Sequence, residues 1–415
     1  MQGDARAALA EAHRDEWARV VAATVRTARD LDLAEESAQE AFAEALTIWS
    51  RDGVPTNPGA WLTTVARRRA IDSLRRAASH QRKLPLLIEP ELDEVESTAP
   101  DVEAVDERGL DDTMRLIFMC CHPSLSREAQ MALTLRLVCG MATGDIAKCF
   151  IVPEATMAAR LTRAKKKITV ARIPFRSPRT DELSDRLEGV LGVIYLLFTV
   201  GHTSPDGDHL IRKDSTREAL RLARLLHEVM LDEPEVTGLL ALLLVIEARQ
   251  ESRVDAVGGA RRISEQDRTM WDRDAIGIAH ELILSSLQSS RPGRYTLQAA
   301  IASLHAHAPT FDDVDWAQIV VLYDELLLVW PSPVVELNRA VAVSKISGPL
   351  TALDIVERLE REGNLDRYQY LPATKAYLLD QLGRRDEADR ARSRALELTT
   401  NQVERAFLAS GGREL

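Results

Sequence analysis

The sequence predicts an all-α protein with several helical domains. Alanine, leucine, arginine and glutamate dominate its composition, and aromatic residues make up 5% of the chain, a bias that favours helix. No run of alternating β-branched residues is bounded by the turn residues of a hairpin. The length of 415 residues is enough for two or three separate cores, so we expect more than one domain.

Two amphipathic helices are predicted first, over residues 9–29 and 33–49, with Asp30 and Asp32 between them. Apolar side chains recur at helical spacing in both helices, whereas carboxylates lie on the open side of the second helix. An exposed acidic face of this kind is ordinarily only solvated surface. The buried stripe of the second helix is expected to contain Ala38, Ala41, Phe42, Ala45, Leu46 and Trp49.

A third amphipathic helix is predicted over residues 60–76, after a turn bracketed by Pro55 and Pro58. The sequence leaves two interpretations of Trp61 open: a packing anchor, or a platform on which an unpaired base stacks. Asp72 is expected to pair with arginines of the same helix. The positions expected to face the core are Leu62, Val65, Ala66, Ile71 and Leu74, and the basic cluster comprises Arg67, Arg68, Arg69, Arg75, Arg76, Arg82 and Lys83.

The acidic stretch over residues 81–109 is predicted to be a flexible linker. The whole chain has a formal net charge of −11, but its charges are segregated, and a local basic face sets the field that a phosphate meets. The stretch contains three prolines and a run of carboxylates, so it cannot bury enough apolar area to fold alone. Its negative charge would either mimic nucleic acid or only keep the linker solvated as a tether.

Residues 142–167 predict a helix-turn-helix whose second helix ends in cations. Ile146 and Ala147 would pack the first helix inward, and Pro153 suits the first position of the second helix. The alternative is a solvated basic helix in an ordinary bundle. The cations that could reach phosphates and base edges in a major groove are Arg160, Arg163, Lys165, Lys166 and Lys167.

The four cysteines, Cys120, Cys121, Cys139 and Cys149, lie near or within the helix-turn-helix region. Adjacent cysteines cannot easily both bind one tetrahedral ion, and no CxxC pair is present. We therefore expect buried thiols, with no metal and no other cofactor.

The second half of the chain, residues 181–415, is predicted to consist of paired helices. Residues 372–396 place Gly383, Ala388 and Ala395 at a spacing similar to that of tetratricopeptide repeats. Small residues at such points let paired helices approach closely and stack into a solenoid. Weaker copies of the pattern lie at residues 335–359, around Ala352, and at residues 217–234.

Enzymatic chemistry is not expected. The loop over residues 201–209 contains His202, His209 and two aspartates, but a loop rich in glycine, proline and aspartate is ordinarily a turn. Neither a phosphate-binding loop nor a nucleophile triad is recognisable. No apolar run is long enough to span a membrane, and the first residues do not resemble a secretory signal, so we expect a cytoplasmic protein.

The order of an acidic helix over residues 35–49, a Trp-Leu-Thr-Thr-Val-Ala-Arg-Arg-Arg helix, an acidic linker and a helix-turn-helix resembles the bacterial extracytoplasmic-function sigma factors of the sigma-70 family. The resemblance covers residues 9–173. Cys-Cys-His-Pro at residues 120–123 and the helical repeats resemble a subgroup with a large C-terminal extension.

The resemblance implies three sets of contact residues. The first set would bind the β′ clamp of core RNA polymerase, with the β subunit as a further partner; the second would capture the melted, single-stranded −10 region of a promoter; the third would read the double-stranded −35 region. In that order the sets are Glu36, Gln39, Glu40 and Phe42; Trp61, Arg67, Arg68, Arg69, Asp72, Arg75 and Arg76; and Glu154, Thr156, Met157, Arg160, Arg163, Lys165, Lys166 and Lys167.

On this basis we expect a sigma factor that binds core polymerase, recognises and melts promoters, and carries a repeat domain that regulates or assists it and could bind a peptide or protein partner. The alternatives are a helix-turn-helix regulator that acts without polymerase, and a repeat-type scaffold. The expected domains are a sigma-2-like domain (1–80), the acidic linker (81–109), a sigma-4-like domain (110–175) and the repeat domain (181–415).

Overall fold

The computed structural model describes residues 2–83, 111–150, 152–176, 180–203, 213–255, 258–289 and 291–410. Within these ranges the regular structure is helical, apart from an isolated antiparallel bridge between Val254 and Ala260, which confirms the all-α prediction. The chain divides into two compact units, residues 1–196 and 197–415. The predicted acidic linker lies almost wholly outside the described residues.

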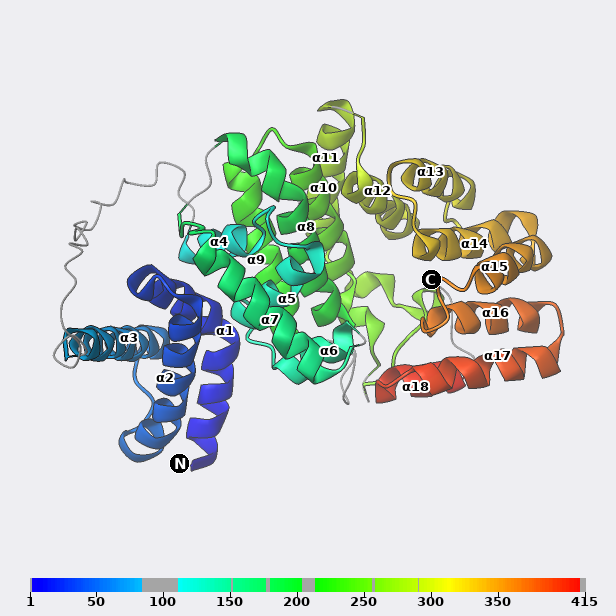
Figure 1. The fold of residues 1–415 in the computed structure, drawn as a ribbon. Coiled ribbons are helices and arrows are strands. Elements are labelled where there is room, and N and C mark those ends of the chain that lie inside the picture. Colours follow the sequence, from blue (N-terminus) through cyan, green and yellow to red (C-terminus); the bar gives the residue numbers. More distant parts are fainter. Residues whose placement is uncertain are drawn as a thin grey trace. The chain divides into compact units, whose positions relative to one another are not determined.

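The first three helices pack on one another as a small bundle: α1 (Gln2–Ala28), α2 (Leu31–Asp52) and α3 (Pro58–Lys83) (Figure 1). Asp30 begins α2 because its side chain accepts a hydrogen bond from the Leu33 N–H at 2.8 Å. Gly53, at φ 89°, ends α2. The core between the helices is built from small side chains that allow close approach, including Ala22, Ala34, Ala38, Ala66 and Ala70.

Three positions that sequence periodicity assigned to this core are exposed instead: Leu46 is 39% exposed, Ile71 37% and Leu74 41%. A helix in a three-helix bundle has neighbours on one side only, so its buried stripe is narrower than the stripe of apolar residues in the sequence. These side chains therefore add apolar surface to the outer faces of α2 and α3.

The predicted helix-turn-helix is present as α6 (Thr143–Cys149) and α7 (Glu154–Val170), which follow α4 (Asp112–Cys120) and α5 (Arg127–Leu137). Pro153 is the residue before α7 rather than its first helical residue. Ile146 and Ala147 are buried, as predicted. Asp111 caps the start of α4, and Ser126 caps the start of α5. Each side chain accepts a hydrogen bond from the backbone N–H of the residue three positions later.

The division between the two units falls inside α8 (Thr180–His202) rather than near residue 181. The start of α8 belongs to the first unit, where the buried Arg186 donates a hydrogen bond to the carbonyl oxygen of Phe118 at 3.4 Å. A Cβ atom at Gly189 would lie 2.7 Å from the Gln130 side chain. This close approach explains why glycine occupies that position in the middle of the helix.

The described part of the second unit continues with ten α-helices. The short 3₁₀ turns η2 (Gln250–Arg253), η3 (Ile263–Glu265) and η4 (Arg268–Met270) lie between α10 and α11. None of the described helices in the chain is both long enough and apolar enough to cross a membrane. The helices are α9 (Lys213–Val229), α10 (Pro234–Glu247), α11 (Arg273–Ser289), α12 (Arg294–His307), α13 (Trp316–Val329), α14 (Pro333–Ser347), α15 (Pro349–Glu362), α16 (Tyr370–Gln381), α17 (Arg385–Leu398) and α18 (Gln402–Ala409).

The repeat pattern corresponds to helices that pack on their neighbours in chain order, from α13 to α17 (Figure 1). Ala352, Ala388 and Ala395 are all completely buried, where small side chains permit close helix contacts. Gly383 lies in the turn between α16 and α17 at φ 74°, a conformation that favours glycine.

Candidate nucleic-acid interface

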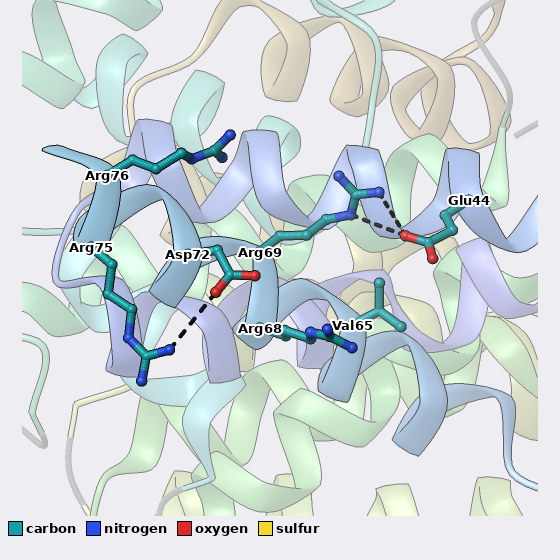
Figure 2. Close-up of a pocket in the computed structure, with 7 residues that line it drawn as sticks. All are labelled: Glu44, Val65, Arg68, Arg69, Asp72, Arg75 and Arg76. Carbon is teal, nitrogen blue, oxygen red and sulfur yellow. Dashed lines mark hydrogen bonds and ion pairs between the residues drawn. The ribbon is translucent and has the colours of Figure 1, made fainter.

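A groove of about 660 Å³ lies along the outer face of α3. Four of its seven lining residues are arginines, and all four belong to the predicted basic cluster. Figure 2 shows these side chains around Asp72, with Glu44 of α2 at one end. The lining residues are Glu44, Val65, Arg68, Arg69, Asp72, Arg75 and Arg76.

Arg69 is tied to α2. Its Nη2 atom lies 2.6 Å from Glu44 Oε2, and its Nη1 atom lies 2.5 Å from Glu40 Oε2 (Figure 2 shows the Glu44 contact). The hydrogen bond to Glu44, followed by that to Glu40, raises the pKa of Arg69. This arginine therefore joins the acidic face of α2 to the basic face of α3, and Glu40, a predicted polymerase contact, is one of its partners.

The remaining arginines of α3 fall into two groups. Arg67 is half-buried and donates from Nε to the Ala23 carbonyl oxygen of α1 at 3.2 Å, so it positions the helix. Arg68, Arg75 and Arg76 are exposed. Of the three, Arg75 has an ion-pair contact to Asp72, at 4.0 Å and with 79% of its side chain exposed, which leaves its guanidinium accessible.

Trp61 packs against the core of the bundle and keeps partial exposure. Its ring packs edge to face against Trp49, with 5.7 Å between ring centroids and an interplanar angle of 65°. Trp49 is 2% exposed, whereas Trp61 is half-buried. One side of Trp61 is thus anchored on the core, and part of its ring is accessible beside the arginines of α3.

On α7, five of the eight predicted contact residues are exposed, and Met157 is completely buried. Met157 belongs to the core that holds α7 in place, so it does not reach DNA. Arg160 lies over the Phe150 ring, 5.7 Å from its centroid, and Lys167 donates to the Ser124 carbonyl oxygen. The exposed residues are Glu154, Thr156, Arg163, Lys166 and Lys167.

Lys165 has a different role from its neighbours because it pairs with α2. Its Nζ atom lies 2.7 Å from Asp32 Oδ1 and 2.6 Å from Glu35 Oε2, and Arg136 of α5 lies 2.6 Å from Glu35 Oε1. Burial lowers the pKa of Lys165, but the hydrogen bonds to Asp32 and Glu35 outweigh that effect and raise it. We call these four residues the clasp. The sequence did not reveal it, since the two partners of each ion pair are 101 to 133 residues apart in the chain.

The predicted polymerase-docking residues of α2 differ in exposure. Glu36, Gln39 and Glu40 are exposed, and Gln39 Nε2 donates to Glu35 Oε1 at 3.0 Å. Phe42 is 6% exposed, and its ring centroid lies 5.6 Å from that of Trp17 in α1. The prediction that Phe42 contacts a partner is not compatible with this burial, because the side chain fills the core of the bundle.

The cysteine pair before α5 is buried and free. Cys120 is completely buried and Cys121 is 1% exposed. Burial raises the pKa of the Cys120 thiol to about 12, so it is protonated at neutral pH, and a protonated thiol is a poor metal ligand. No cluster of three or more metal-binding side chains is present in the described part of the chain.

Comparison with known proteins finds family matches in three parts of the chain. Residues 9–80 match the family described as sigma-70 region 2, residues 115–168 match sigma-70 region 4, and residues 186–287 match a family of unknown function, DUF6596. An uncharacterized protein of Rhizobium meliloti (strain 1021) is 43% identical over 387 residues, which cover 93% of this chain and 90% of the relative. No solved structure matches the chain.

Proposed function

We propose that this chain, which belongs to the sigma-70 family as an extracytoplasmic-function-type sigma factor with a C-terminal helical extension, binds core RNA polymerase, reads the −35 duplex with α7 and captures the melted −10 strand along α3. The groove lined by Arg68, Arg75 and Arg76 carries this proposal. Its cations are accessible and belong to the helix that bears Trp61.

The chemistry of this groove fits a single strand. Each unstacked base costs a few kcal/mol, which a small domain can offset by stacking bases on an aromatic ring while cations hold the backbone. Trp61 supplies a partly accessible ring and Arg68, Arg75 and Arg76 supply the cations. Arg69 is already neutralised by Glu40 and Glu44, so we assign it to holding the groove in shape.

The exposed cations of α7 fit a duplex. The second helix of a helix-turn-helix enters the major groove, where arginine and lysine contact phosphates and guanine edges. Arg163 and Lys166 are exposed on this helix, and Met157 and Leu161 fix its opposite face in the core. We therefore propose Arg163 and Lys166 as principal −35 contacts, with Arg160, Lys167, Glu154 and Thr156 beside them.

For polymerase we propose the exposed residues of α2, Glu36 and Gln39, as contacts with the β′ clamp. Glu35, which ties the clasp together, lies on the same helix. Docking on a large, charged partner would thus compete with the clasp, and release of Lys165 would free α7 to reach upstream DNA. The C-terminal unit would regulate or assist this process.

Transcription reconstituted with purified core polymerase tests the proposal. Initiation from a promoter that depends on this chain is the expected result. Duplex binding without any initiation would favour a regulator that acts without polymerase. If the chain bound neither polymerase nor promoter DNA, a scaffold role for the repeats would remain.

Trp61→Ala is expected to slow promoter melting by roughly 10-fold while closed-complex formation changes little, because base–aromatic stacking contributes about 1–3 kcal/mol per base. Permanganate footprinting over time measures the opening. Trp61→Phe, which keeps a ring against Trp49, is the matched control and should retain most of the rate. Normal opening by Trp61→Ala would reject the stacking role.

Lys166→Ala is expected to weaken binding to −35 duplex and to reduce the slope of log affinity against log salt by about 1, as for the loss of one phosphate contact. Fluorescence anisotropy of the polymerase-bound factor at several salt concentrations measures both. Thr169→Ala, at an exposed position of the same helix, should leave the slope unchanged. An unchanged slope in Lys166→Ala would place this lysine outside the interface.

A further inference from the structure

Three arginines gather around one buried tryptophan of the second unit. Trp271 is 3% exposed and donates from Nε1 to Ser252 Oγ at 2.8 Å. The guanidinium carbons of Arg268, Arg273 and Arg249 lie 4.4, 5.7 and 5.8 Å from the centroid of its ring. They come from separate segments: Arg268 begins η4, Arg273 begins α11, and Arg249 lies between α10 and η2.

Part of this cationic cluster has a structural task. Arg268 Nη1 donates to the carbonyl oxygens of His305 and Ala308, at 2.8 and 2.7 Å, and Arg273 Nη1 donates to that of Ala306 at 3.3 Å. These carbonyl groups form the C-terminal end of α12, where cations are favourable because the helix dipole is negative there. The arginines thereby hold η4 and α11 against α12.

Other donors of the same cluster have no partner. Arg249 Nε and Nη1, Arg268 Nη2 and His305 Nδ1 are buried and make no hydrogen bond. His305 itself is 8% exposed. Among the ion pairs of the described residues, none includes Arg249 or Arg268. A buried donor without a partner is costly, and more so when it is charged.

The cluster also has a strongly positive field. Burial, and then repulsion from Arg253 and Arg268, lowers the pKa of Arg249 to about 10. Burial, and then Arg249 and Arg268, lowers the pKa of His305 to about 3. Arg249 and Arg268 are half-buried as whole residues, and their unpaired donor atoms are buried. An anion is the group that such a field and such donors would accommodate.

We propose that Arg249, Arg268 and His305 form an oxyanion-binding site in the C-terminal unit, and that its ligand is a phosphoryl group, free or carried by a small molecule. Guanidinium groups recognise the oxygens of phosphate in a planar, forked geometry. The charge of a doubly ionised phosphoryl group balances the charges of two arginines, whereas the charge of a single carboxylate balances that of one. The bound group would join the start of η2, the start of η4 and the end of α12.

Thermal unfolding of the full chain in increasing inorganic phosphate, at ionic strength held constant with chloride, tests the site. A saturable rise of roughly 5–10 °C in the transition of the C-terminal unit is expected at about 100 times the dissociation constant. Arg249→Gln should reduce the apparent affinity for phosphate at least about 10-fold. The Nε and Nη1 atoms of Arg249 make no hydrogen bonds in the fold, so this variant should remain folded.

Arg224→Gln, at an exposed position of α9, removes the same charge away from the cluster and is the matched control that should retain the response. Tighter binding of adenosine monophosphate than of phosphate would identify a phosphorylated small molecule, and equal binding would identify free phosphate; both support the site. An equal response to acetate would overturn the phosphoryl assignment. An absent response, or one that Arg249→Gln retains in full, would overturn the site.

A second readout is the imidazole of His305. An anion beside it would raise its pKa from the low value that burial and the arginines impose. Proton NMR titration of the histidines with and without phosphate would follow this shift, which should be absent from Arg249→Gln. A His305 signal that phosphate does not move would contradict the proposal without bearing on promoter recognition.

Discussion

The combined replacement Arg68→Ala, Arg75→Ala and Arg76→Ala is expected to lower affinity for melted −10 DNA by roughly 100-fold or more and to abolish promoter opening. A hydrogen bond to a charged group contributes about 1.5–3 kcal/mol, and about 1.4 kcal/mol is a factor of ten. The three guanidinium groups are exposed around the α3 groove. Removing them should cost little stability, because their charges face solvent.

Binding of the polymerase-bound factor to forked DNA with an unpaired −10 strand measures this loss. The slope of log affinity against log salt should fall by about 2, since single strands release about 0.7 counterions per neutralised phosphate. The control Arg361→Ala, Arg385→Ala and Arg390→Ala removes the same charge from exposed positions of the second unit. Equal losses in both triple variants would mean that net charge, and not the groove, determines binding.

Glu35→Gln is expected to lower the free energy of unfolding of the first unit by about 2–3 kcal/mol. Glu35 is 5% exposed and accepts from both Lys165 and Arg136. Neutralising it leaves two cations without their common partner, and breaking a buried ion pair costs about 3–5 kcal/mol. The lower figure applies here because the Lys165 and Arg136 side chains are 12% and 19% exposed.

Equilibrium urea unfolding measures this change. Glu36→Gln, at the exposed neighbouring carboxylate, is the matched control and should alter stability by less than about 0.5 kcal/mol. A double-mutant cycle with Arg136→Met should give a coupling energy of about 1–3 kcal/mol. Additive losses in that cycle would show that the two side chains contribute independently and that the clasp is not a unit.

The clasp should also have a characteristic pH dependence. The pKa of Lys165 is raised above its ordinary value of 10.5, so the folded state holds this proton more tightly than the unfolded state does. Its contribution to stability is therefore complete below the unfolded pKa and is lost as the pH rises through the higher folded pKa. The free energy of unfolding of the natural chain should thus fall at alkaline pH by an amount that Lys165→Met, which lacks this contribution, does not show.

The contrast between neighbouring residues shows where sequence reasoning stops. Arg67 and Arg68 are the same residue type in the same helix, yet Arg67 donates to the Ala23 carbonyl and Arg68 is exposed in the groove. Lys165 and Lys166 differ in the same way, since only Lys165 meets Asp32 and Glu35. Helical position relative to distant helices, and not composition, decides which cation is available.

What the sequence determined by itself was local: the all-α class, the helix-turn-helix of α6 and α7, and the small residues at the turns and contacts of the repeats, such as Gly383 and Ala388. Helix periodicity, capping and turn conformation depend on residues a few positions apart, so they can be derived from the printed sequence. Only the tertiary structure decided that Met157 is in the core, that the clasp exists, and that unpaired donors gather near Trp271. Burial and charge pairing depend on groups brought together from far along the chain, and no local pattern encodes those distances.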